Sequence, residues 1–231
     1  MRYILAVAIL SFFPVYQYLH PGKADQPATP VAKPGILYIY LNDLTASDAW
    51  IPPLPKDEVF NLVVHNVQSY SHVQVSGIRI TADSRRQTPY LSEKIICDLQ
   101  PATGNLYQQS AIRSTNKKMF DRARLQAAFT TDSLMSYIDL PRTDQHTDMN
   151  GALLLAKQLC IPYDRENMKI KIVIIGDCLH DMSRTKALQP ISFPTNTTIY
   201  VIGKSDEVDL QRLFPLNKVV ELPVFKAQFV N

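Results

Sequence analysis

The chain has 231 residues, of which 46% are hydrophobic and 19% are charged, and its formal net charge is +3. This composition is typical of a folded globular protein and excludes a chain that is disordered throughout. A balance of 24 basic against 21 acidic residues is too even to indicate a protein that binds nucleic acid or a membrane surface through its charge.

The N-terminus has the pattern of a secretory signal or of an uncleaved signal anchor. Arg2 provides a short positive region, residues 4–13 are apolar, and Gly22 and Ala24 are the small residues of a cleavage site. We therefore assign residues 1–24 to a signal peptide or signal anchor. Removing this leader leaves about 200 residues, which is enough for one sizeable α/β core.

The leader predicts an exported protein that is periplasmic, extracellular or membrane-anchored, with a possible membrane tether through residues 1–20. Residues 25–34 are rich in proline and alanine, which predicts an extended linker. Residues 35–231 are then expected to form the folded domain.

Three cysteines remain in the domain, at Cys97, Cys160 and Cys178, and none has metal-ligand spacing. In an exported protein one pair could form a disulfide bond. Three buried, unpaired cysteines fit the sequence equally well, so both alternatives stay open.

The first half of the domain begins with a strand and a helix. Residues 35–41, GILYIYL, form an unbroken apolar run, which is typical of a central parallel strand covered on both faces. Pro55 and the acids after it mark a helix start, and apolar residues repeat at helical spacing from Val59 to Val67. Residues 72–81 and 92–99 are expected to be strands, joined as a hairpin that makes one strand an antiparallel edge.

The second half of the domain alternates in the same way. Residues 114–138 are expected to be helical, in two pieces broken near Thr130 and Thr131. The lysines and arginines between Arg113 and Arg124 form a basic stretch. This stretch is expected to be the solvent-exposed face of a helix, and the alternative is a patch that binds a partner. The elements expected after it are a helix at 147–159, a strand at 169–177, a strand at 197–204, a helix start at 205–214 and a strand at 218–224.

Strands that alternate with helices predict a doubly wound α/β fold, with a mainly parallel central sheet, one antiparallel edge strand and helices on both faces. Ligands of such sheets bind at the carboxyl ends of the strands. Asp43 and Asp177 each follow an apolar strand, so we expect both at this edge. A simpler interpretation, in which the two acids only cap loops, also fits.

The residues after the first strand favour metal binding. Asp43, Thr45 and Ser47 alternate, and a loop can point such side chains at one place. A carboxylate and two hydroxyls are the hard oxygen donors that Mg²⁺ or Mn²⁺ prefers. Asp177 could add a second carboxylate, and Thr147, which opens a helix, could complete the set.

In these residues the chain resembles the von Willebrand factor A domain family and its metal-ion-dependent adhesion site. Residues 43–47, DLTAS, are similar to the Asp-x-Ser-x-Ser motif of the family, with threonine for the first serine. Thr147, Gly151 and Ala152 match the threonine, glycine and alanine that open a later helix, and Asp177 matches the aspartate that ends a later strand. Gly-Asp-Cys replaces the usual Thr-Asp-Gly around that aspartate, and the segment from residue 43 to residue 147 is longer than in the family.

The resemblance implies a metal-dependent protein-binding domain, used for adhesion or as a scaffold, with Mg²⁺ or Mn²⁺ as its cofactor. Thr45 and Ser47 would bind the metal directly, Asp43 and Asp177 directly or through water, and Thr147 would join when a ligand arrives. The open coordination position would accept a carboxylate of a partner protein. The resemblance requires no catalytic residue and no nucleic acid.

An enzymatic alternative also fits part of the sequence. Residues 176–181, GDCLHD, are similar to a motif of haloacid dehalogenase-like phosphatases. Asp43 would then be the nucleophile, Asp177 and Asp181 would bind Mg²⁺, and Lys157 would stabilise phosphate. Against this reading, a threonine occupies the position of the second acid that serves as general acid in most such enzymes.

Overall fold

The computed structural model describes five stretches of the chain, with gaps between them. The predicted leader, nearly all of the predicted linker and the candidate ligands Thr45 and Ser47 lie outside them. Residues 33–231 form one compact unit. In the described part of the chain, no helix is long and apolar enough to cross a membrane. The described stretches are residues 32–43, 53–140, 146–164, 167–182 and 187–230.

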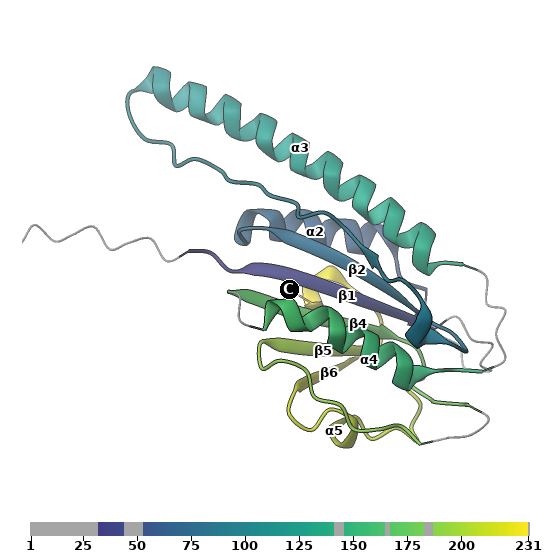
Figure 1. Cartoon of the computed structure of the whole chain (residues 1–231). Coiled ribbons are helices and arrows are strands. Elements are labelled where there is room, and N and C mark those ends of the chain that lie inside the picture. Colours follow the sequence, from purple (N-terminus) through teal and green to yellow (C-terminus); the bar gives the residue numbers. More distant parts are fainter. Residues whose placement is uncertain (1–31, 44–52, 141–145, 165–166, 183–186, 231) are drawn as a thin grey trace, which may run out of the picture. The chain divides into compact units, whose positions relative to one another are not determined.

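The described residues build a six-stranded sheet with the order β3-β2-β1-β4-β5-β6. Every neighbouring pair is parallel except β2 and β3, which are antiparallel. This confirms the predicted doubly wound fold with one antiparallel edge strand (Figure 1). The strands are β1 (Gly35–Asp43), β2 (Val73–Ile80), β3 (Tyr90–Leu91), β4 (Met168–Ile175), β5 (Thr197–Ile202) and β6 (Lys218–Leu222).

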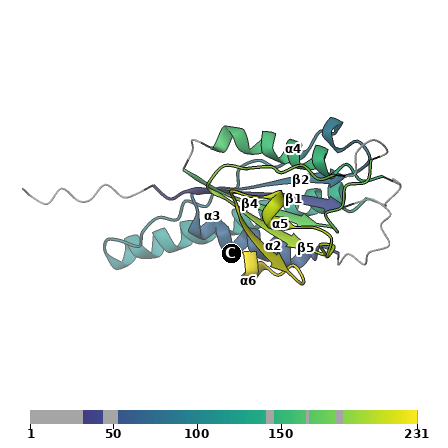
Figure 2. The same ribbon diagram turned by 90° about the horizontal axis from the view of Figure 1, so that it is seen from below.

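Helices cover both faces of the sheet, as the sequence predicts (Figure 2). One face packs against α4 and α5, and the other against α2, α3 and α6. Two short 3₁₀ helices, η1 and η2, lie in the connections. The bounds are α2 (Lys56–Ser69), η1 (Ser84–Arg86), α3 (Leu106–Ile138), α4 (Met149–Cys160), η2 (Ile161–Tyr163), α5 (Leu210–Leu213) and α6 (Ala227–Val230).

The apolar run of β1 is explained by its central position in the sheet. Successive side chains of a strand point to opposite faces, so a strand that is covered twice must be apolar at every position. In β1 one set of side chains enters the core under α4, and the alternate set enters the core under α2 and α3. The first set is Leu37, Ile39 and Leu41, and the second is Ile36, Tyr38 and Tyr40.

Two predicted elements are wrong in detail. The strand expected at residues 92–99 is absent, because only Ile95 forms an isolated bridge, to Val73, while the edge strand lies earlier at β3. Ser92 is bonded to β2 through both backbone and side chain, since its N–H donates to the carbonyl of Val75 at 2.8 Å, its hydroxyl accepts from the N–H of Val75 at 2.9 Å and its carbonyl accepts from Gln74 at 2.8 Å. The helix expected from 205 to 214 is reduced to the single turn α5.

Helix α3 is one unbroken helix of 33 residues, so the predicted break near Thr130 and Thr131 is wrong. Both threonines are buried, at 4% and 1% exposure. The helix propensity of threonine is lower than that of alanine by only about 0.7 kcal/mol or less, which tertiary packing readily outweighs. All three cysteines are buried and unpaired, so the structure supports the alternative without a disulfide.

A buried lysine ties the C-terminal helix to the sheet. Lys171 on β4 is only 7% exposed, donates to the backbone carbonyl of Val230 in α6 and lies 5.8 Å from the ring centroid of Tyr38. Burial, with a smaller effect of the neighbouring Lys169, lowers the pKa of Lys171 to about 8. In the unfolded chain the same amine has its usual pKa near 10.5.

This difference predicts a pH-dependent stability. Between about pH 8 and pH 10.5 the unfolded state binds more protons at Lys171 than the folded state, so its contribution to stability rises with pH. Lys171→Met removes this contribution. We expect the stability of the wild type minus that of Lys171→Met to increase from pH 7.5 to pH 9.5, by at most about 1.4 kcal/mol per pH unit. Urea denaturation of both proteins at each pH measures the difference, and parallel pH profiles would contradict the prediction.

Candidate metal site at the carboxyl edge of the sheet

Asp43 and Asp177 lie at the carboxyl ends of two neighbouring strands. β1 and β4 are paired in parallel, with Asn42 opposite Ile175, so the next residues on both strands leave the sheet at the same edge. Both carboxylate-bearing residues are buried, Asp43 at 0% and Asp177 at 3% exposure. The expectation that the two acids share one edge is therefore met by the register of the strands.

The two chain segments approach each other closely at Gly176. A β-carbon added at this glycine would lie 2.7 Å from the β-carbon of Asp43 and 3.3 Å from its Oδ2 atom. Real β-carbons essentially never approach other atoms to within 3.0 Å. Glycine at position 176 thus lets the backbone before Asp177 pass directly beside the side chain of Asp43.

The turn at Asp177 is fixed by three features. The Oδ1 atom of Asp177 accepts from the backbone N–H of Leu179 at 2.9 Å, and its carbonyl accepts from Ser205 at 2.9 Å. Cys178 between them has a φ of 59°, in the left-handed region that favours glycine. Cys178 therefore has a backbone conformation that favours glycine. It stands where the Thr-Asp-Gly pattern described above has its glycine.

The pKa of the Cys178 thiol reflects its burial and the negative charge of nearby carboxylates. Its side chain is buried, and burial raises the pKa of the thiol, with further increases from the carboxylates of Asp177 and Asp43. The thiol therefore stays protonated at neutral pH and is not a reactive nucleophile. Both carboxylates are close enough to act on the same buried group, which places them in one electrostatic environment.

Thr147 and the next residue, Asp148, are held at the same edge by backbone hydrogen bonds to two other segments. Thr147 forms an isolated antiparallel bridge with Asp181, with N–H to carbonyl distances of 3.1 and 3.0 Å. The next residue, Asp148, donates its N–H to the carbonyl of Thr81, which follows β2, at 2.8 Å. Thr147 is 7% exposed and joins the segments that follow the two neighbours of β1.

The start of α4 explains the small residues that follow Thr147. Asp148 is the N-cap, and its Oδ1 atom accepts from the N–H of Gly151 at 2.9 Å. A β-carbon at Gly151 would collide with this carboxylate, so the glycine makes room for the cap. Ala152 is buried in the core under α4, where a small side chain allows close packing.

Three of the five predicted metal ligands, Asp43, Thr147 and Asp177, are thus buried at one edge, while Thr45 and Ser47 lie outside the described residues. Within the described stretches, no group of three or more His, Cys, Asp or Glu side chains could hold a metal ion. The predicted ligand set has only two such residues and takes its other donors from hydroxyls. Metal binding at this edge therefore stays a prediction.

The residues of the phosphatase alternative are not all at this edge. Lys157 is exposed and lies eight residues after the first residue of α4, about 12 Å along the helix from its amino end. The side chain of Asp181 is 55% exposed and lies 3.8 Å from the imidazole of His146. The position of Lys157 does not fit the role of stabilising a phosphate beside Asp177.

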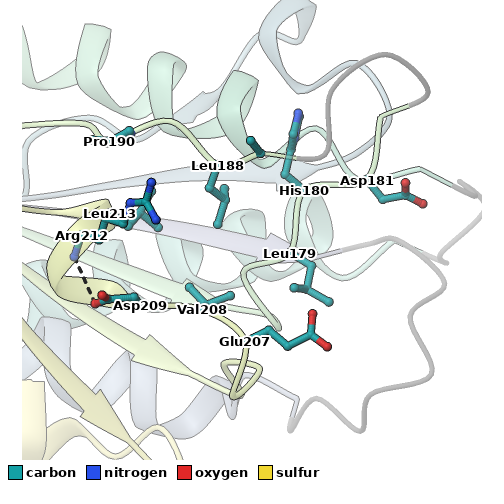
Figure 3. A pocket seen from close by; sticks show the side chains of 11 residues that line it. Leu179, His180, Asp181, Leu188, Pro190, Glu207, Val208, Asp209, Arg212 and Leu213 are labelled. Atoms are coloured by element: carbon teal, nitrogen blue, oxygen red, sulfur yellow. Dashed lines mark hydrogen bonds between the residues drawn. The ribbon is translucent and has the colours of Figure 1, made fainter.

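A pocket that sequence reasoning missed lies beside the turn at Asp177 (Figure 3). It has a volume of about 590 Å³, and its wall comes from the segment after β4 and from the segment that leads into α5. The available signals were the leucines at positions 179 and 188 and the acidic helix start predicted at 205–214. The lining residues are Leu179, His180, Asp181, Ala187, Leu188, Pro190, Glu207, Val208, Asp209, Arg212 and Leu213.

No protein-family model and no curated protein sequence matches the chain. Among solved structures, the chain is similar to one described as the crystal structure of the TFIIH p34 N-terminal domain. The TM-score is 0.35 and the sequence identity 15%, over 83% of this chain and 92% of that chain. A similarity of this degree does not extend to function, so the fold class assigned above follows from the strand order and strand directions of this chain.

Proposed function

We propose that the chain is a metal-dependent protein-binding domain of the von Willebrand A type, exported or tethered to a membrane. The observation that supports this proposal is the burial of Asp43 and Asp177 at neighbouring strand ends beside Gly176. Two buried carboxylates in one low-dielectric environment repel each other, and each is costly to remove from water. A divalent cation at this edge would neutralise both charges.

The donor chemistry fits Mg²⁺ or Mn²⁺. Asp43 and Asp177 would provide carboxylate oxygens, and Thr147 a hydroxyl, with Thr45 and Ser47 completing the set through the loop after β1. Hard oxygen donors of this kind suit Mg²⁺, which also keeps some ligands that are not protein groups. The bound ion would supply an open coordination position that accepts a carboxylate of a partner protein.

The pocket beside Asp177 provides a place for the rest of such a partner. Apolar side chains, among them Leu188 and Val208, share its wall with polar ones, as is usual for a binding pocket of this size. The backbone N–H of Leu179 is bonded to Asp177, so the pocket and the carboxylate belong to one turn. An apolar side chain next to the acidic residue of the partner would enter this pocket.

Metal titration of the full chain tests the proposal. After treatment with EDTA, Mg²⁺ or Mn²⁺ should raise the thermal midpoint, because a ligand at 100 times its Kd adds about 2.7 kcal/mol to stability. Asp43→Asn should lose this response. Asp181→Asn is the matched control, since Asp181 is a nearby acid that the proposal does not use and the phosphatase alternative does.

The same preparations are assayed for hydrolysis of p-nitrophenyl phosphate with Mg²⁺. We expect no turnover, together with a metal response that Asp181→Asn retains. Turnover that is abolished by Asp43→Asn would favour the phosphatase, and the absence of any metal response would leave the edge as a structural feature. Either result would overturn the proposal.

A further inference from the structure

The amino-terminal half of α3 extends beyond the sheet (Figure 1). None of the residues 106–122 is buried, and the first buried residue of the helix is Ala123. We call residues 106–122 the α3 arm; at 1.5 Å per residue it is roughly 25 Å long. The buried residues from Ala123 onward pack against α2 and the sheet, and within the arm Phe120 is partly buried against the same core.

The arm is defined by local interactions. A capping box at its start joins the Asn105 side chain to the N–H of Gln108 and the Gln108 side chain to the N–H of Asn105. Farther along, the amide of Asn116 bonds both the N–H and the carbonyl of Gln100, at 2.9 and 2.8 Å. Isolated helices of this length are marginal in water, so these local bonds, together with the contact of Phe120 and the packed second half of α3, hold the arm in helical form.

The α3 arm and the two helical residues that follow it, 123 and 124, form a strongly basic segment. Between residues 106 and 124 the only acidic residue is Asp121. None of the ion pairs in the described stretches involves the basic residues of this segment. These residues are Arg113, Lys117, Lys118, Arg122 and Arg124.

Two large apolar side chains are exposed just after the arm. Leu125 is 74% and Phe129 73% exposed, and at a spacing of four residues they form neighbours on one side of the helix. At about 100° per residue, Leu125 points about 180° away from Leu134, which is buried against the sheet. On the same scale Lys118, Arg122, Leu125 and Phe129 lie within about 60° of arc, so cations and apolar groups share the outward face.

We infer that the outward face of α3, formed by Lys118, Arg122, Leu125 and Phe129, is a docking surface for an acidic amphipathic helix of a partner protein. Leu125 and Phe129 would pack against the apolar stripe of that helix, in the way that two helices interdigitate their side chains. Lys118 and Arg122 would meet its carboxylates, which gives charge complementarity along the contact. This surface does not use Asp43 or Asp177, so the inference is independent of the proposed metal site.

The charge of this surface and the spacing of its apolar residues disfavour two other binding partners, a second copy of the chain and a membrane surface. A second copy of the same face would place cations against cations, which is unfavourable. A membrane-surface helix presents a continuous apolar face, whereas here Lys118 and Arg122 lie between the exposed Tyr107 and Leu125. A helix with separated apolar and acidic positions fits the observed spacing better than either.

The test uses the full chain and a fluorescently labelled synthetic helical peptide built from Leu and Glu, with Leu at i, i+3 and i+4 positions. Fluorescence anisotropy should show binding of this peptide, weaker binding at high salt, and no binding of the matched peptide with Lys in place of Glu. The double variants Leu125→Ser/Phe129→Ser and Lys118→Glu/Arg122→Glu should each weaken binding at least 10-fold. Leu216→Ser is the matched control, because Leu216 is 75% exposed elsewhere and should leave binding unchanged.

Because the four side chains lie on an outward face, the variants should keep the thermal midpoint of the wild type, so a loss of binding is not a loss of folding. Equal binding of the Lys peptide, or equal binding by both double variants, would overturn the inference. Two further results would replace it with another occupant. One is arm-dependent binding to vesicles with phosphatidylserine, and the other is arm-dependent dimerisation in sedimentation equilibrium.

Discussion

Gly176→Ala is expected to destabilise the protein by about 2 kcal/mol, in the range observed for overpacked cores. The new β-carbon would lie 2.7 Å from the β-carbon of Asp43, an atom that cannot rotate away as the tip of a long side chain would. Either the end of β1 or the turn before Asp177 must shift. Because this shift moves the Asp43 carboxylate, the proposed response to Mg²⁺ should weaken as well. Urea denaturation and metal titration measure the two effects.

A double-mutant cycle isolates the contact. In the Asp43→Gly background the colliding β-carbon is absent, so Gly176→Ala should cost at least 1 kcal/mol less than in the wild type, within the usual range of coupling for residues in contact. An equal cost in both backgrounds would show that the alanine acts elsewhere. It would also contradict the close approach of the two strand ends.

Cys178→Val is expected to cost about 3 kcal/mol. Cysteine already bears the cost of about 1–2 kcal/mol that the left-handed conformation at φ 59° places on a residue with a β-carbon, and a β-branched side chain, which is a true outlier there, adds further strain. The cavity around the thiol is closed, since Cys178 is completely buried, so the extra methyl group adds overpacking. Thermal or urea denaturation of the purified variant gives the value.

Cys178→Gly is the matched control for the backbone. Glycine takes the left-handed conformation without the steric cost but leaves a small cavity where the sulfur was, and these effects oppose each other. We expect a change within about 1 kcal/mol of the wild type. If glycine and valine were equally destabilising, packing of the sulfur alone would determine the stability at this position.

The fold could be predicted because its central strands are covered on both faces. Residues 36–41 of β1 and 172–175 of β4 are unbroken apolar runs, and this pattern is visible in the sequence without knowledge of their neighbours. The order of the strands is not visible in this way, since it is set by contacts between segments such as β1 and β4 that are more than a hundred residues apart. The shared edge of Asp43 and Asp177 could therefore be expected but not established from the sequence.

The errors occur where side chains from elsewhere decide the local structure. Thr130 and Thr131 suggest a helix break by propensity, but burial keeps α3 continuous. The early start of α3 had a usable signal, because Asn105 and Gln108 stand at capping-box spacing. The pocket beside Asp177 had only weak signals, since its lining comes from two connecting segments, one after β4 and one before α5, that no periodic pattern marks.

Among the described residues, the two outer strands of the sheet are short, and this affects how copies of the protein meet. β3 has only two residues, and β6 has five, among them the charged Lys218 and Glu221. A long, flat, uncharged edge would offer a row of backbone groups on which another sheet could add strands. Here either edge gives an incoming strand few backbone partners, and the charges of β6 oppose such pairing further. The architecture thus protects a chain rich in β-branched residues against edge-to-edge aggregation.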